Sequence, residues 1–380
     1  MSIDLVRFEK NLNKYFYVTY DVESTVSIFD AAWNIAVGQS IGNPSKRSIW
    51  ETDEMIEAHC AKIMHSPDFD KKSGRVIIAY PLANINFKND GISQLLATII
   101  GGQVDIGTIT KCRVIDLEIA DDLLKANFLG PKHGLTGMRK KTGQYNKPLF
   151  GGIVKPKVGL KPNELLDMVK ELVDGGVDFV KEDEILGDVE ICRLEDRVEL
   201  ISNYIRDTNV VYTFCINSDA DQVLKNARFV YENGGCGVHT NIWSGLGTYR
   251  SIRNMNTNLY IHYQKSGDRV ITDKRNPFGV SWPVLCKLAV MSGVDTIHSG
   301  MIGGYLDSDE EEMLEVLKIL RAGNVVPALS CGMTAELIAP IAEKIGMDWM
   351  ANVGGGIHSD PKGSTAGALK IRNAIEAVAK

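Results

Sequence analysis

Residues 175–184 combine an apolar run with a lysine and several carboxylates, side chains that could hold a metal ion. The segment reads Gly-Gly-Val-Asp-Phe-Val-Lys-Glu-Asp-Glu. Alternation along a β-strand puts Lys181 and Asp183 on one face and Glu182 on the other, with Glu184 where the strand gives way to a loop. A lysine beside inward acids has two interpretations, a buried salt bridge and a metal site, and the residues alone leave both open.

The elements that must position this segment form a repeating pattern from Phe150 onward. Short apolar runs alternate eight times with segments of helical spacing, such as Leu165, Val169 and Leu172 after the first run. Eight successive βα units predict an α/β fold, a closed parallel (β/α)8 TIM barrel over residues 150–380. The predicted strands are 150–155, 177–183, 210–217, 236–240, 259–263, 296–299, 325–330 and 349–353.

Polar residues end the predicted strands, and the C-terminal strand ends are where such barrels carry their active sites. A single histidine in such a place is more often structural than catalytic. The convergence of many polar ends on one rim therefore carries the prediction. In chain order the ends hold Lys155 and Lys157, then Lys181, Asp183 and Glu184, then Asn217, His239, His262, His298, Ser330 and Gly354-Gly355-Gly356.

The first 125 residues follow a different pattern. Strand-like runs at 15–21, 75–81 and 109–119 are interrupted by helical patterns at 51–64 and 92–100. This arrangement predicts an N-terminal α+β domain of ferredoxin-like layout over residues 1–125. Residues 126–149 are rich in glycine and lysine and are expected to connect this domain to the barrel.

Composition excludes several classes of protein. A net charge of -6 and the lack of a basic run argue against nucleic acid as a partner. No apolar stretch approaches the roughly 18 residues of a membrane span, and the N-terminus lacks the apolar core of a signal peptide. Seven cysteines without a Cys-x-x-Cys pair fit free thiols in a reducing compartment. A cytoplasmic protein without membrane contact is expected.

Over nearly the whole chain, these motifs resemble the RuBisCO large-subunit superfamily. Residues 175–184 are similar to the family signature in which a lysine, carbamylated by CO2, holds Mg²⁺ with two acids. The resemblance implies that carbamylated Lys181, Asp183 and Glu184 are the metal ligands. Three anionic side chains would leave about three Mg²⁺ positions for a chelating substrate and water.

The other strand-end motifs resemble the family's substrate site. Residues 152–160 are similar to its first barrel strand, which implies that Lys155 handles protons and that Lys157 is a second active-site lysine. Residues 262–265, 297–300, 327–332 and 352–356 resemble motifs of the later strands. The resemblance implies that His298 is catalytic and also contacts a substrate phosphate. It further implies a homodimer with the active site at the subunit interface, and substrate or phosphate binding by His262, Lys265, Ser330, Gly332, Gly354 and Gly355.

Departures from the carboxylase pattern matter as much as the matches. Gly304 stands where carboxylases have a mobile lysine, and Gln264 replaces a proton-relaying histidine. Lys265 replaces a phosphate-binding arginine and offers a point charge without the bidentate fork. Gly38 and Gly102 stand where the family's N-terminal domain supplies a glutamate and an asparagine to the partner's site. This pattern resembles the RuBisCO-like proteins, which keep enolisation but do not fix CO2.

The resemblance implies Mg²⁺-dependent enolisation, isomerisation or decarboxylation of a small phosphorylated keto-sugar or keto-acid. Salvage of methylthio-sugar phosphates and breakdown of branched sugars are examples. A lysine would act as acid or base beside the metal. Two alternatives stay open. An authentic ribulose-bisphosphate carboxylase is opposed by Gly304 and Gln264, and a non-catalytic regulatory or scaffold protein is opposed by the retention of all three candidate metal ligands.

Overall fold

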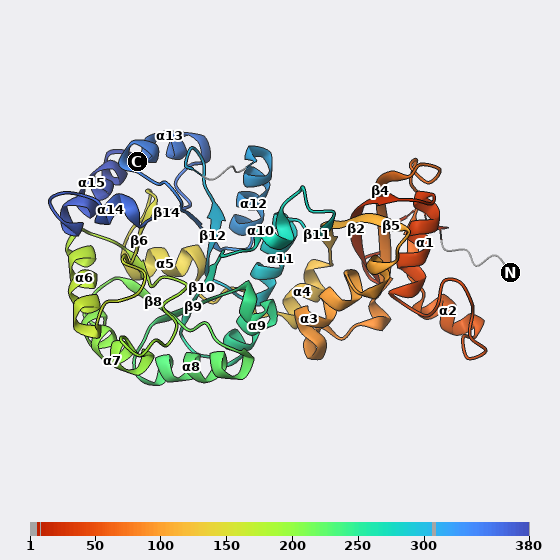
Figure 1. Ribbon diagram of the computed structural model, residues 1–380, viewed down its shortest axis with the longest axis horizontal. Helices are drawn as coiled ribbons and strands as arrows, with labels where there is room; N and C mark the ends of the chain where they lie inside the picture. Colours follow the sequence, from red (N-terminus) through yellow and green to blue (C-terminus); the bar gives the residue numbers. More distant parts are fainter. Residues whose placement is uncertain (1–5, 8, 306–308, 380) are drawn as a thin grey trace. The chain divides into compact units, whose positions relative to one another are not determined.

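The computed structural model describes residues 6–7, 9–305 and 309–379, and the chain divides into two compact units (Figure 1). One unit comprises Met1–Phe128 together with Asp268–Leu288, and the other comprises Leu129–Gly267 together with Ala289–Lys380. The N-terminal unit therefore takes up a segment that follows the fifth barrel strand in sequence.

Eight parallel strands close into a barrel in the second unit, which confirms the predicted fold class. Each strand overlaps its predicted range. The strands are β6 (Leu149–Ile153), β7 (Phe179–Lys181), β8 (Val211–Cys215), β9 (Gly237–Asn241), β10 (Tyr260–Gln264), β12 (Thr296–Gly300), β13 (Val326–Leu329) and β14 (Met350–Val353).

Helices surround the barrel, and most of them bury one apolar face, as Leu165, Val169 and Leu172 do in α6. They are visible as the outer ring in Figure 1. The helices are α6 (Pro162–Asp174), α7 (Leu194–Ile205), α8 (Ala220–Glu232), α9 (Leu246–Asn254), α11 (Trp282–Ser292), α12 (Glu310–Ala322), α13 (Ala335–Ile345) and α15 (Ser364–Ala377).

An apolar cluster fills the N-terminal end of the barrel. Most of its members are the first residues of their strands, and Met138 of α5 (Gly134–Thr142) joins them from the segment that precedes the barrel. This end is therefore sealed by packing, and the C-terminal strand ends are left for polar groups. The cluster comprises Met138, Leu149, Phe179, Val211, Tyr260, Val326, Ala328 and Met350.

The N-terminal unit contains a six-stranded sheet in the order β1-β3-β4-β2-β5-β11. Its four central strands pair antiparallel, and with helices α1 (Ile28–Gly38) and α3 (Phe87–Ile99) they form the predicted ferredoxin-like layout. The strands are β1 (Val6–Arg7), β2 (Tyr15–Ser24), β3 (Lys62–Met64), β4 (Ser73–Pro81), β5 (Ile109–Glu118) and β11 (Phe278–Val280).

The predicted helix over residues 51–64 is wrong in its last part. The structure has a short helix, α2 (Asp53–His59), followed by strand β3. Lys62 and Ile63 pair with Ala79 and Ile78 of β4, and all three residues of β3 are buried. Pairing with a neighbouring strand therefore overrides the local helical pattern, as tertiary contacts commonly do.

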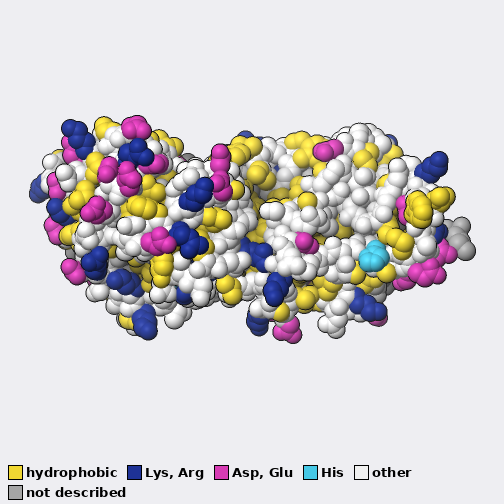
Figure 2. All heavy atoms as spheres, turned by 90° about the horizontal axis from the view of Figure 1, so that it is seen from below, with side chains coloured by type: hydrophobic (Ala, Val, Ile, Leu, Met, Phe, Trp, Pro, Cys, Tyr) yellow, Lys and Arg dark blue, Asp and Glu magenta, His cyan; other side chains and the backbone are white. Residues whose placement is uncertain are grey.

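The exterior carries both signs of charge. On the face shown in Figure 2, lysine and arginine side chains are interspersed with acidic ones. Within the part of the chain that the structure describes, every helix is too short or too polar to cross a bilayer.

Candidate active site

Lys181 ends strand β7 at the C-terminal end of the barrel, and its side chain is only 1% exposed. Its Nζ donates a hydrogen bond to Oε1 of Gln264 at 2.5 Å and lies 3.7 Å from Oε2 of Glu184. Burial lowers the pKa of Lys181, and the negative charges of Glu184 and Asp183 only partly oppose that change. A lowered pKa favours the neutral amine, the form of lysine that can react with CO2.

Asp183 lies two residues beyond Lys181 and is also buried. Its Oδ2 accepts a hydrogen bond from Nζ of Lys155 at 2.6 Å, and its Oδ1 lies 4.0 Å from Nζ of Lys157. Burial by itself would raise the pKa of Asp183, but the hydrogen bond from Lys155 and the positive charges of Lys155, Lys181 and Lys157 together lower it. The structure therefore brings both predicted lysines of the first strand to one predicted metal ligand.

Glu184 is held by contacts from two other strands. Nε2 of Gln264 donates to its Oε2 at 3.2 Å, and Oγ of Ser266 lies 3.5 Å from its Oε1. The backbone carbonyl of Glu184 accepts from Nδ2 of Asn217 at 2.6 Å, and Oδ1 of Asn217 accepts from Thr240. Both the carboxylate and the backbone of Glu184 are thus fixed toward the barrel opening.

Glu182 points away from the lysine cluster, as strand alternation predicts, and supports the segment from outside. It forms a wholly buried ion pair with Arg197 of α7 at 2.9 Å and accepts from the Cys215 amide at 2.7 Å. Arg197 also donates to the backbone carbonyls of Gly187 and Cys192. The ion pair of Glu182 and Arg197 stabilises the loop that follows Glu184. Residue types alone did not indicate this role.

Three histidines lie inside the barrel, each as the middle residue of its strand. The rings of His262 and His298 are 4.7 Å apart between centroids, and those of His239 and His262 are 6.1 Å apart. His262 contacts Thr296 through Nδ1 at 2.6 Å, and His298 accepts from Nδ2 of Asn352 at 2.6 Å.

Each of these histidines has a pKa well below the usual value, first because of burial and then because of neighbouring positive charge. Neither ring nitrogen of His239 has a hydrogen-bond partner, nor does Nε2 of His262. The structure therefore places His262 and His298 in an uncharged layer of the barrel interior, although the predicted phosphate contacts would lie at the open rim.

The predicted phosphate-binding residues surround the same opening. Ser330 follows β13 and is buried, while Lys265 follows β10 and is half-buried. A Cβ atom added to Gly354 would lie 3.4 Å from Cε of Lys155, so the end of the eighth strand adjoins the first. A Cβ atom added to Gly355 would meet nothing within 4 Å, which leaves its backbone open to a ligand.

Gly304, where the resemblance places the carboxylase lysine, packs tightly against the turn after β13. An added Cβ would lie 2.3 Å from the carbonyl oxygen of Cys331 and 2.4 Å from Cγ of Met301. The amide of Tyr305 donates to the same Cys331 carbonyl at 3.3 Å, and a Cβ on Gly332 would lie 2.9 Å from the Tyr305 ring. The loop therefore approaches the turn through positions that have no side chain.

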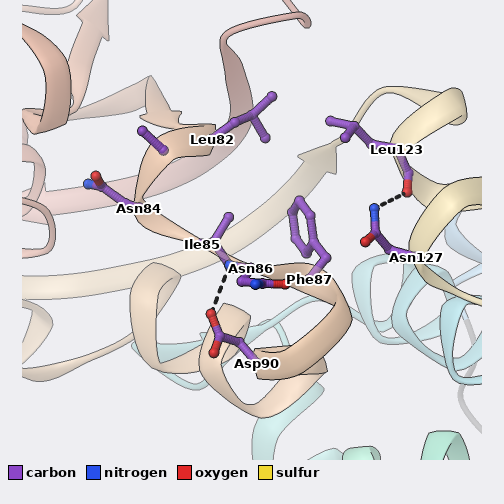
Figure 3. A pocket seen from close by; sticks show the side chains of 9 residues that line it. Leu82, Asn84, Ile85, Asn86, Phe87, Asp90, Leu123 and Asn127 are labelled. Atoms are coloured by element: carbon purple, nitrogen blue, oxygen red, sulfur yellow. Dashed lines mark hydrogen bonds between the residues drawn. The ribbon is translucent and has the colours of Figure 1, made fainter.

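A pocket of about 560 Å³ in the N-terminal unit, drawn in Figure 3, does not contain any of these residues. Its polar side chains are engaged in local contacts. Asp90 accepts from the amide of Asn86, and Asn127 donates to the carbonyl of Leu123, both drawn as dashed lines. These contacts lie at the ends of helices. Among the described residues that line the pocket, Asp90 is the only charged one, so the pocket has no cluster of charges comparable to the barrel site.

The side chains present fit a cation only with the lysine modified. Within residues 9–305 and 309–379, no group of three His, Cys, Asp or Glu side chains is arranged to hold a metal ion. Asp183 and Glu184 supply two carboxylates beside the amine of Lys181, and carbamylation would convert that amine into a third anionic oxygen donor. Such an oxygen-rich set has the chemistry that Mg²⁺ prefers.

The chain has a (β/α)8 barrel with lysines and carboxylates at its C-terminal strand ends, and it has a ferredoxin-like unit as well. This combination defines the class of protein to which the chain belongs. Two family models match the sequence: the ribulose bisphosphate carboxylase large chain catalytic domain over residues 134–380 and the N-terminal domain of the same chain over residues 7–123. The chain belongs to this RuBisCO large-chain family, whose members are enzymes.

Similar proteins include both carboxylases and RuBisCO-like proteins. A ribulose bisphosphate carboxylase of Pyrococcus furiosus is 32% identical over 93% of this chain and 86% of its own. A dimeric archaeal Rubisco from Hyperthermus butylicus has a TM-score of 0.89 at 25% identity, covering 98% of this chain and 93% of its own. A rubisco-like protein from Alicyclobacillus acidocaldarius has a TM-score of 0.84 at 27% identity, covering 96% and 93%.

Sequence reasoning named the charged side chains of the cluster but not most of the residues that hold them. Gln264 was noted only as a departure from the family pattern. The supporting roles of Arg197, Thr296 and Asn352 were missed. The usable signal was position, since Gln264, Thr296 and Asn352 lie on barrel strands beside predicted site residues.

Proposed function

We propose that this chain is a RuBisCO-like enzyme. It catalyses Mg²⁺-dependent enolisation, isomerisation or decarboxylation of a phosphorylated keto-sugar or keto-acid, and it does not fix CO2. The observation that carries the proposal is the packing of Gly304. A lysine at this position would begin with a Cβ atom 2.3 Å from the Cys331 carbonyl oxygen, so the loop has no room for the carboxylase side chain.

The retained residues support proton transfer next to a carbonyl group. Lys155 is hydrogen-bonded to Asp183 at 2.6 Å and is partly open, with 30% of its side chain exposed. A lysine in this position can pass a proton to or from a substrate carbon. Bound Mg²⁺ would stabilise the negative charge that develops on the substrate oxygen. Carbamylated Lys181, Asp183 and Glu184 are the residues that would hold the ion.

The substrate's phosphate has matching groups around the same opening. Lys265 would supply positive charge, Ser330 a hydroxyl, and Gly332, Gly354 and Gly355 their backbone amides. Backbone amides near a barrel's last strands commonly bind phosphate. His262 and His298 lie deeper in the barrel. Because burial keeps their rings neutral, they would orient the substrate as polar, uncharged groups.

A homodimer and a cytoplasmic location complete the proposal. The dimeric archaeal relative supports the first, and cysteine usage supports the second. Gly38 and Gly102 provide no side chain to a partner's site. In the N-terminal unit the side chain of Gln103 occupies the space next to Gly38, where an added Cβ would lie 2.1 Å away from it.

Exchange of carbon-bound protons in D2O, followed by NMR, tests the function directly. The substrates are ketose phosphates, keto-acid phosphates, methylthio-pentulose phosphates and ribulose bisphosphate, each with Mg²⁺ and bicarbonate. Exchange that disappears when Mg²⁺ is removed supports enolisation and identifies the substrate class. Incorporation of labelled CO2 into ribulose bisphosphate would overturn the proposal in favour of a carboxylase, the name that the Pyrococcus relative carries.

We predict that Lys181→Ala abolishes both turnover and Mg²⁺-dependent binding of the substrate. The substitution removes the amine that CO2 would convert into the third metal ligand. Asp183 and Glu184 alone would then have to hold the ion. Lys170→Ala is a matched control, because Lys170 is a surface lysine of α6 paired with Asp167 at 2.9 Å. Unchanged exchange in a folded Lys181→Ala variant would contradict the metal site.

A further inference from the structure

The side chain of Gln264 forms hydrogen bonds to two of the predicted metal ligands, Lys181 and Glu184. It ends strand β10, which is separated from β7 in the barrel by β8 and β9. Its side chain is buried, with Oε1 2.5 Å from Nζ of Lys181 and Nε2 3.2 Å from Oε2 of Glu184. A single amide therefore spans the barrel opening between an amine and a carboxylate.

The orientation of this amide follows from the chemistry of its neighbours. Nε2 faces Oε2 of Glu184 and, at 3.3 Å, the backbone carbonyl of Lys265, and both of those groups only accept hydrogen bonds. The amide NH2 must therefore point toward them, which leaves Oε1 as the acceptor for Lys181. The reversed amide would set oxygen against two oxygens and NH2 against an amine.

Formation of a carbamate changes the number of hydrogens on Nζ, and Gln264 is placed to keep one of them. The lone pair of the neutral amine forms a C–N bond to CO2, one C–O π pair moves onto oxygen, and one proton leaves Nζ for water. The product keeps a single N–H. The bond to Oε1 of Gln264 can hold that N–H both before and after the reaction, whereas the lone pair points away from Gln264.

We propose that Gln264 is a positioning residue for Lys181: it holds the N–H that survives carbamate formation and ties it to Glu184, so that the new carboxylate is directed to the metal ligands. This inference rests on the proposed function, since it concerns the same metal site. An amide performs this role without gaining or losing a proton. The side chain that departs from the family pattern thus has a defined task.

The test measures the carbamate itself by NMR with ¹³C-labelled CO2 at fixed pH, and Mg²⁺ affinity by calorimetry. Gln264→Met keeps a straight side chain but removes both hydrogen-bonding groups. Gln264→Leu also removes both groups and has a shorter, branched side chain. Gln222→Met is the control, because Gln222 is an exposed residue of α8 that bonds to Asn226.

We expect a carbamate signal in the wild-type protein that is absent in Lys181→Ala. Carbamate occupancy and Mg²⁺ affinity should both fall about tenfold or more in Gln264→Met, the effect of losing a hydrogen bond to a charged site. Gln264→Leu should show the same loss, because it also leaves the N–H of Lys181 without the acceptor. Gln222→Met should match the wild type.

Two outcomes separate the failure of this inference from failure of the proposed function. A wild-type protein without a Lys181 carbamate would overturn both. A normal wild-type carbamate with occupancy in Gln264→Met within twofold of it would overturn the positioning role alone and leave the metal site standing. Gln264→Leu keeps the test decisive if Gln264→Met fails to fold, since a leucine that preserved full occupancy would equally exclude the role.

Discussion

Lys155 and the proposed Mg²⁺ ion would share the carboxylate of Asp183. The side chain of Lys155 donates to Oδ2 at 2.6 Å, and two positive charges beside one carboxylate repel each other. A bound cation would therefore compete with Lys155 for the negative charge of Asp183.

We predict that Lys155→Met separates metal binding from catalysis. Mg²⁺ affinity, measured by calorimetry in the presence of bicarbonate, should stay unchanged or increase, because a competitor for Asp183 is removed. Exchange of substrate protons should fall by about a hundredfold or more, the usual contribution of a general acid or base. A parallel loss of Mg²⁺ affinity would instead make Lys155 a structural support of Asp183.

The buried histidines predict how stability depends on pH. Each has a folded-state pKa below the unfolded value of about 6.5. Between these two pKa values the unfolded chain binds a proton at each histidine and the folded barrel does not. Stability is therefore unaffected above the unfolded value and falls as the pH decreases from it toward the folded pKa. Each histidine contributes a slope of about 1.4 kcal/mol per pH unit within this window.

His239→Leu should reduce this acid sensitivity by the share of one histidine. His239 is wholly buried and neither ring nitrogen has a hydrogen bond, so the apolar replacement should also cost little at neutral pH. Urea unfolding between pH 7 and pH 5 measures the slope. His65→Leu, at an exposed position, serves as control, and an identical slope in wild type and His239→Leu would contradict the explanation.

Among the elements, the loop after β12 gives the most direct support for the proposed difference from a carboxylase. Its approach to the turn after β13 depends on Gly304, and the Tyr305 amide bonds to the Cys331 carbonyl at 3.3 Å. A lysine cannot simply be restored there, because its Cβ would displace the backbone of the neighbouring turn.

We predict that Gly304→Lys fails to create carboxylation and lowers the free energy of unfolding by about 1–3 kcal/mol, the usual cost of overpacking. Labelled CO2 incorporation and urea unfolding measure the two effects. Gly107→Lys is the matched control, since an added Cβ at Gly107 meets nothing within 4 Å. Carboxylation of ribulose bisphosphate by Gly304→Lys would show that the loop relaxes freely and that glycine alone withholds the activity.

The barrel strands could be predicted because local burial determines them. A strand covered on both faces needs a continuous apolar run, and all five residues of β8, for example, are buried. Other elements depend on partners distant in sequence. Lys62–Met64 becomes a strand only because β4 lies beside it, and Phe278–Val280 only because β5 does. Three residues contain too little periodicity to reveal such pairing.

The candidate site divides in the same way. The charged strand ends were visible by residue type, as Lys181 and Asp183 show. The groups that hold them were not, because Gln264 and Lys181 come together only when the barrel closes. Likewise, alternation predicted that Glu182 faces outward, but its partner Arg197 depends on how α7 packs.

For the whole molecule we expect a homodimer, as in the dimeric archaeal relative. Light scattering after size-exclusion chromatography should give the mass of two 41.8-kDa chains at assay concentrations. Because the resemblance implies a site shared between subunits, we expect dilution that produces monomers to abolish exchange activity. A monomer with full specific activity would contradict the shared site and would confine the chemistry to the barrel of one chain.

Strand β11 sets the order in which the protein can be completed during translation. Its partner β5 ends at Glu118, and β11 begins at Phe278, after strands β6 to β10 have been synthesised. Until then the edge of β5 emerges from the ribosome without its final neighbour, and an unpaired edge invites association with other chains. The N-terminal unit is thus synthesised first, but its sheet stays incomplete until more than half of the barrel strands have been synthesised.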